Sequence, residues 1–111
     1  MKGTLMALGG AMVIALSANA APSNAYDGLA LKKWADDYAA NAGFNAGLYA
    51  GYVIAVKDVF DGILFCVPGG TTNAQIVSAV SGYLGQNPDR LNDRAHALVT
   101  SGMIAAYPCK K

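Results

Sequence analysis

Apolar residues recur at three- and four-residue intervals along most of the chain, and strict alternation of apolar and polar residues is not found. In residues 25–41 the residues that follow this helical spacing are Leu29, Leu31, Trp34, Ala35 and Tyr38. Lysines and aspartates occupy many of the sequence positions between these apolar residues. The pattern predicts an amphipathic helix whose apolar side carries the only tryptophan, with a break at Gly43.

A second helix is predicted over residues 44–62. Its expected core residues are Phe44, Leu48, Tyr52, Val56, Val59, Phe60 and Ile63. Gly47, Gly51 and Ala55 follow one another at intervals of four residues. Because small side chains in such a row let another helix approach closely, we expect a helix to pack on this side.

The charged residues in the second half of this helix decide between a soluble and a membrane-spanning segment. Rows of small residues also occur in transmembrane helices, so a membrane span is the alternative. Lys57, Asp58 and Asp61 argue against it. Lys57 and Asp61 lie one helical turn apart and are expected to form a weak ion pair.

The third helix has a clear beginning. Residues 67–71 form a connector that is rich in proline and glycine, and Thr72 with Gln75 then matches a capping box. Gly85 is expected to end the helix. The expected buried stripe consists of Ile76, Val77, Val80, Tyr83 and Leu84.

The fourth helix is predicted to open at Asn87 and Pro88, as a cap followed by a proline in the first helical position. Pro108 is expected to stop it. The expected inner face consists of Leu91, Ala95, Leu98, Val99, Gly102, Met103 and Ala106. Together these patterns predict an all-α fold, a small bundle of about four helices that gain their stability by packing together.

The first twenty residues match an export signal. Lys2 provides a basic start, residues 5–16 are apolar, and residues 18–20 fit a cleavage site with small side chains. The apolar run is too short for a membrane anchor, which needs about 20 residues. We therefore expect residues 1–20 to be a signal peptide and residues 21–111 to be a single periplasmic domain without a stable membrane anchor.

The charge of this domain narrows the class of partner. The chain has eight Lys and Arg residues, one of which is Lys2, and seven acidic residues, all of them aspartates. The domain without Lys2 is therefore close to neutral. A neutral surface argues against nucleic acid or anionic lipid as the main partner.

Two cysteines, Cys66 and Cys109, are present, each close to a proline. In an oxidising compartment they are expected to form a disulfide that closes the third and fourth helices into one lobe. Two separate buried thiols are the alternative. A zinc site is not expected, because two cysteines and a single histidine do not provide four ligands.

The sequence offers little catalytic chemistry. His96 lies between two alanines on a predicted helix, where a surface role is expected. The acidic pair Asp36 and Asp37 fits a charged helix face, and Gly69-Gly70 lacks the lysine of a phosphate loop. No nucleophile-elbow context surrounds Ser78, Ser81 or Ser101. We therefore expect neither an enzyme nor a bound metal or cofactor.

Several short motifs, in their order and spacing, resemble the Rap/Tai immunity proteins of type VI secretion. The resemblance covers about residues 49–109. The stretches that carry it are residues 51–58, Phe65-Cys66-Val67-Pro68, Thr72, Gln75, Tyr83-Leu84, Asn87-Pro88, Ala95, Leu98-Val99 and Tyr107-Pro108-Cys109.

The resemblance implies a small helical periplasmic protein that binds and blocks a cell-wall amidase injected by neighbouring cells. Because members of the family are often dimeric, it also implies a homodimer. A periplasmic helical binding module of another kind, such as an acid-stress chaperone-like protein, is the alternative.

The polar segment between the third and fourth helices is the candidate surface for the partner. In the resembling family this part of the fold reaches toward the amidase cleft, and the cap, the proline and the disulfide-closed lobe are expected to hold it rigid. An ordinary interhelical turn is the alternative. The predicted partner-binding residues are Gln86, Asn87, Asp89, Arg90 and Asp93.

Overall fold

A computed structural model describes residues 25–110, so the predicted signal peptide lies outside the described residues. The elements in chain order are the α-helices α2 (Gly28–Ala39), α3 (Gly43–Phe60) and α4 (Asn73–Gln86), the short 3-10 helix η1 (Pro88–Arg90) and the α-helix α5 (Ala95–Ala106). Only isolated β-bridges occur in the described part of the chain. The prediction of an all-α fold with four helices is confirmed.

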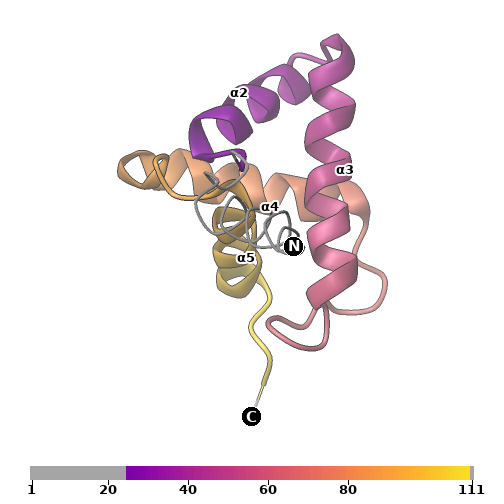
Figure 1. Cartoon of the computed structure of the whole chain (residues 1–111). Helices are drawn as coiled ribbons and strands as arrows, with labels where there is room; N and C mark the ends of the chain where they lie inside the picture. The colour runs from indigo at the N-terminus through magenta and orange to yellow at the C-terminus, as the bar shows by residue number, and fades with distance from the viewer. Residues whose placement is uncertain (1–24, 111) are drawn as a thin grey trace, which may run out of the picture.

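The helices pack as two pairs that cross each other. Figure 1 shows α2 and α3 joined at one end, with α4 running across them and α5 below. Contacts between α2 and α3 and between α4 and α5 are the most extensive, and α3 also packs on α4. All four helices contribute to one core, whose largest fully buried side chains are Tyr49, Phe65, Leu31, Ile76, Leu84, Leu98 and Met103.

Capping and backbone conformation define the first helices. The Asp27 carboxylate caps α2 by accepting a hydrogen bond from the amide of Ala30 at 3.0 Å. Between α2 and α3 the chain turns at Asn41 and Gly43, both with positive φ angles of 55° and 64°. Gly43, the predicted break, is the first residue of α3.

The capping box of Thr72 and Gln75 is present at the start of α4, as predicted.

The buried face of α3 differs from the prediction. Phe44 is 81% exposed and Ile63 is 70% exposed, while the fully buried residues of α3 are Tyr49 and Val53. Leu29 and Val59, also expected in the core, are exposed. The prediction was wrong for Phe44, Val59 and Ile63, whereas the other four residues pack against the core as expected: Leu48, Tyr52, Val56 and Phe60. Because α3 is apolar on nearly every side, the spacing of its apolar residues does not mark one face.

Tyr49 shows which side of α3 faces inward. Its hydroxyl group lies 3.1 Å from the carbonyl oxygen of Val77 and 2.7 Å from Oγ of Ser81, so it joins α3 to α4. Burial raises the pKa of Tyr49 to about 12, because the interior disfavours the phenolate. In residues 25–110 no helix is long and apolar enough to cross a membrane.

The last helix begins later than predicted. Pro88 starts η1, and α5 begins only at Ala95. Between them the chain is held by the residues around the start of α2. The carbonyl oxygen of Asp93 accepts the amide of Gly28 at 2.9 Å, and the amide of Ala95 donates to the carbonyl oxygen of Tyr26 at 2.8 Å. The Asp93 carbonyl and the Ala95 amide are therefore not available for the hydrogen bonds of a helix that starts at Pro88.

The predicted disulfide is present between Cys66 and Cys109, whose Cα atoms are 4.8 Å apart. It joins the connector before α4 to the segment after α5, and the amide of Cys66 also donates to the carbonyl oxygen of Tyr107 at 2.8 Å. The bond therefore closes the last two helices into one lobe.

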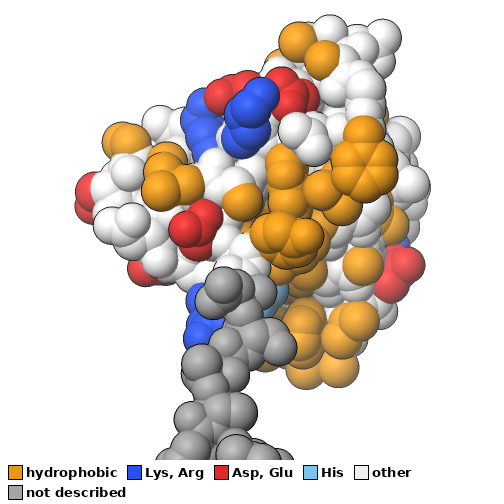
Figure 2. All heavy atoms as spheres, turned by 45° about the horizontal axis from the view of Figure 1, so that its top comes forward, with side chains coloured by type: hydrophobic (Ala, Val, Ile, Leu, Met, Phe, Trp, Pro, Cys, Tyr) orange, Lys and Arg blue, Asp and Glu red, His pale blue; other side chains and the backbone are white. Residues whose placement is uncertain are grey.

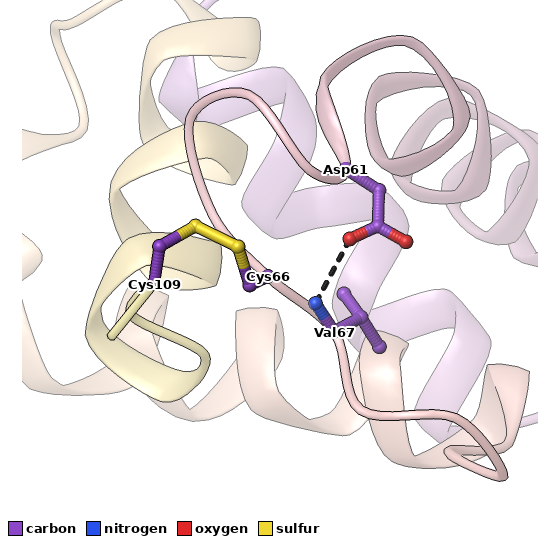
Figure 3. The surroundings of a disulfide bond; sticks show 4 residues. All are labelled: Asp61, Cys66, Val67 and Cys109. Carbon is purple, nitrogen blue, oxygen red and sulfur yellow. Dashed lines mark hydrogen bonds between the residues drawn. A yellow bond between two sulfur atoms is a disulfide. The ribbon is translucent and has the colours of Figure 1, made fainter. Parts of the chain in front are cut away.

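Asp61 shapes the connector beside the disulfide. Figure 3 shows its carboxylate turned toward the amide of Val67, which donates to it at 2.9 Å. The predicted ion pair between Lys57 and Asp61 is not formed, since the Lys57 ammonium lies 3.6 Å from Asp58 instead. The Asp61 carboxylate thus accepts a backbone hydrogen bond of the connector and does not pair with a lysine.

Candidate functional site

The candidate site is the segment that links α4 to α5 together with the last residue of α4, residues 86–94, which we call the α4–α5 loop. It lies at one end of the α4–α5 pair, on the left of Figure 1. Gln86 and Asp89 are exposed, whereas Asn87, Arg90 and Asp93 are partly buried. The five predicted partner-binding residues therefore divide into two that face solvent and three that are engaged within the protein.

Arg90 folds back onto α4. Its Nη1 atom donates to the hydroxyl group of Tyr83, and its carbon Cζ lies 5.9 Å from the centre of the Tyr83 ring. Its Nε and Nη2 atoms lie 2.9 Å and 2.8 Å from Oδ2 of Asp93. The hydrogen bond to Asp93 raises the pKa of Arg90 above its ordinary value, so the guanidinium stays charged.

Asn87 does not cap the last helix as predicted. Its side-chain amide donates to the carbonyl oxygen of Tyr83 at 2.8 Å, and the residue ends α4. Within the loop, the amide of Arg90 donates to the carbonyl oxygen of Asn87 at 3.0 Å, and that of Asp93 donates to the carbonyl oxygen of Arg90 at 2.9 Å. The loop therefore has a defined backbone conformation.

Sequence reasoning missed the part played by the segment before α2. Besides the backbone hydrogen bonds of Tyr26 and Gly28, Asp27 forms an isolated bridge with Arg94. A Cβ atom on Gly28 would lie only 2.7 Å from the Cα atom and the carbonyl oxygen of Leu91. No local pattern could have revealed this contact, because its partners are far apart in the sequence.

The disulfide lies away from the loop. It joins the two ends of the α4–α5 pair that are opposite the loop, and α4 alone spans about 20 Å at 1.5 Å per residue. A shallow cavity of about 510 Å³ is found at the disulfide end, lined in part by Cys66, Pro68, Tyr107 and Cys109. The expectation that the disulfide helps to hold the loop is thus not supported by its position.

The residues considered for catalysis are dispersed. His96 is exposed on α5, and the hydroxyl of Ser81 is held by Tyr49 and by the carbonyl oxygen of Val77. Asp36 and Asp37 pair with Lys32 and Lys33 along α2, as a charged helix face would. Residues 25–110 contain no cluster of three side chains suited to a metal ion.

Apolar side chains also form part of the surface. Figure 2 shows them gathered over the region where α2 and α3 meet, beside a group of basic and acidic side chains. The large exposed hydrophobic residues of α2, α3 and the segment before them are Tyr26, Leu29, Tyr38, Phe44 and Val59. These exposed apolar residues and the α4–α5 loop are both accessible to a partner.

The chain was compared with known proteins. The model of one family, described as Rap1a immunity proteins, matches residues 24–109. This range includes all four helices, both cysteines and the α4–α5 loop. The comparison with curated proteins gives no match.

Proposed function

Because the chain belongs to the family of Rap1a immunity proteins, we propose that it is a non-catalytic periplasmic protein that binds and inhibits a peptidoglycan amidase delivered by type VI secretion. The family match supports an immunity function. The amidase as target follows from the resemblance of the sequence motifs. The observation that carries the proposal is a projecting polar loop that is already ordered in the free protein.

In this proposal the α4–α5 loop enters the concave active site of the amidase. Gln86 and Asp89 are exposed and form none of the side-chain hydrogen bonds found in residues 25–110, so they are free to contact the enzyme. Asn87, Arg90 and Asp93 act by shaping the loop. An ordered loop loses little conformational entropy on binding, which favours tight inhibition.

The test is capture of secreted peptidoglycan amidases by immobilised residues 21–111, followed by titration of the captured enzyme. We expect Gln86→Ala combined with Asp89→Ala to weaken binding by about 100-fold, as loss of two central contacts would. The melting temperature should not change, because neither side chain supports the fold. Inhibition of peptidoglycan cleavage should fall in parallel.

A matched control combines Asp36→Ala with Ser78→Ala, which also removes one carboxylate and one polar group from exposed helix positions. This variant should bind like the wild type. Capture of no amidase would contradict the proposed target. If the protein instead suppressed aggregation of unfolded clients at acidic pH, the chaperone-like alternative would be favoured.

We also propose that two copies of the protein associate through the outer side of α3. Gly47, Gly51 and Ala55 are exposed there, and a Cβ atom on either glycine would meet nothing within 4 Å. Within residues 25–110 no helix covers this row, contrary to the expectation from its spacing. A helix that is apolar all round usually has every side buried, and two such rows can approach closely.

Sedimentation of the purified protein measures this association. We expect a dimer at micromolar concentrations and a monomer for Gly51→Arg, because the long charged side chain would separate the two helices. Gly82→Arg is the control, since Gly82 is also an exposed helical glycine with open space above it. A monomeric wild type, or a dimeric Gly51→Arg variant, would argue against this surface.

A further inference from the structure

The α4–α5 loop is held by side chains as well as by its own backbone. Its backbone forms two hydrogen bonds within the loop, from the amide of Arg90 to the carbonyl oxygen of Asn87 and from the amide of Asp93 to that of Arg90. The guanidinium of Arg90 then connects Tyr83, on α4, with Asp93, at the end of the loop. This side chain therefore spans the loop from one end to the other.

Tyr83 is itself fixed in place. A Cβ atom on Gly102 would lie 3.1 Å from Cβ and 3.3 Å from Cγ of Tyr83, so this tyrosine packs closely on α5. Its carbonyl oxygen accepts the side-chain amide of Asn87, while its hydroxyl group accepts Arg90. One residue on the rigid α4–α5 pair thus contacts both the beginning and the middle of the loop.

We propose that Tyr83 and Arg90 are positioning residues that keep the α4–α5 loop in the conformation that its partner recognises. Arg90 itself is directed inward, so the polar side chains left for the partner are those of Gln86, Asp89, Asn92 and Arg94, all of them exposed. They offer one carboxylate, two amides and one guanidinium, so the complementary surface presents both hydrogen-bond donors and acceptors. The part of this inference that concerns the partner rests on the proposed function.

Two variants each weaken a different part of the contacts that the Arg90 guanidinium makes with Tyr83 and Asp93. Tyr83→Phe keeps the ring that packs on Gly102 and removes only the hydroxyl acceptor. Arg90→Lys keeps the positive charge, but a single ammonium group cannot reproduce the fork that reaches both Tyr83 and Asp93. Tyr38→Phe is the control, since Tyr38 is a partly exposed tyrosine away from the loop.

Hydrogen exchange of the free protein tests the positioning role without any partner. We expect Tyr83→Phe and Arg90→Lys to accelerate exchange of the Arg90 and Asp93 amides by about fivefold or more, as loss of one hydrogen bond would. The amide of Val99, in the middle of α5, and all amides of the Tyr38→Phe control should exchange as in the wild type. Unchanged exchange of the loop amides in both variants would overturn the inference.

Affinity for the captured amidase separates this inference from the proposed function. When a binding-competent conformation is populated less, the apparent dissociation constant rises by the same factor. We therefore expect both variants to bind the amidase more weakly, by the factor by which the population of the ordered loop falls. Cys66→Ser, assayed well below its melting temperature, should bind like the wild type, because the disulfide is at the other end of the helices.

The possible outcomes are distinct. Faster loop exchange with unchanged amidase affinity would show that Tyr83 and Arg90 order the loop without contributing to binding, which overturns the part of the inference that concerns the partner. Unchanged affinity of the variant that combines Gln86→Ala with Asp89→Ala would instead contradict the proposed function. If Cys66→Ser also accelerated exchange of the loop amides in its folded state, the assignment of the loop's order to Tyr83 and Arg90 would be overturned. If no amidase is captured, hydrogen exchange alone decides the positioning role.

Discussion

Cys66→Ser is expected to lower the free energy of unfolding of the oxidised protein by about 4 kcal/mol, since the disulfide closes a loop between residues separated by 43 positions. The cross-link restricts the unfolded chain and thereby favours the folded state. Cys66 is only partly buried, so a serine hydroxyl at this position can still contact water. For a domain of this size the loss corresponds to a fall in melting temperature of roughly 15–30 °C.

Urea and thermal unfolding, each with and without a reductant, measure this effect. Cys109→Ser should be destabilised to the same extent, because either substitution removes the same cross-link. A reductant should lower the stability of the wild type toward that of the two variants and should leave the variants themselves unchanged. Equal melting of the oxidised and reduced wild type would show that the disulfide contributes nothing to stability.

Gly28→Ala is expected to destabilise the fold by about 3 kcal/mol, toward the upper end of what overpacking costs. The new Cβ atom would lie 2.4 Å from Cδ1 of Leu98 and 2.7 Å from the backbone of Leu91. The Leu98 side chain can rotate away, but the Leu91 backbone is fixed by the α4–α5 loop. Nor can Gly28 move freely, because its amide is bonded to Asp93 at 2.9 Å.

The matched control for this substitution is Gly82→Ala. Gly82 is an exposed residue of α4, and a Cβ atom there meets nothing within 4 Å. Alanine at this position should stabilise the protein by up to about 1 kcal/mol through its higher helix propensity. Chemical unfolding of both variants gives the comparison. A Gly28→Ala variant as stable as the wild type would mean that the close contact with Leu91 relaxes at no cost.

The candidate loop could be located from the sequence because the residues that interrupt the helical pattern are neighbours in the chain. Gln86 to Arg90 is a polar run with a proline between two helical patterns, and such a run predicts an exposed connection whatever surrounds it. The roles of its residues were not predictable in the same way. Arg90 and Asp93 look like contacts for a partner, yet each uses its charge within the protein.

The helical class, the capping box of Thr72 and the pair of cysteines were determined by the sequence itself, because short-range spacing and local hydrogen bonding specify them. The buried side of α3 and the start of α5 were decided only by the tertiary structure. A helix that is apolar on nearly every side has no preferred face by itself, and here the hydrogen bonds of Tyr49 to α4 select the buried one. Likewise α5 begins late because its preceding residues pair with Tyr26 and Gly28, and contacts between distant residues leave no local pattern in the chain.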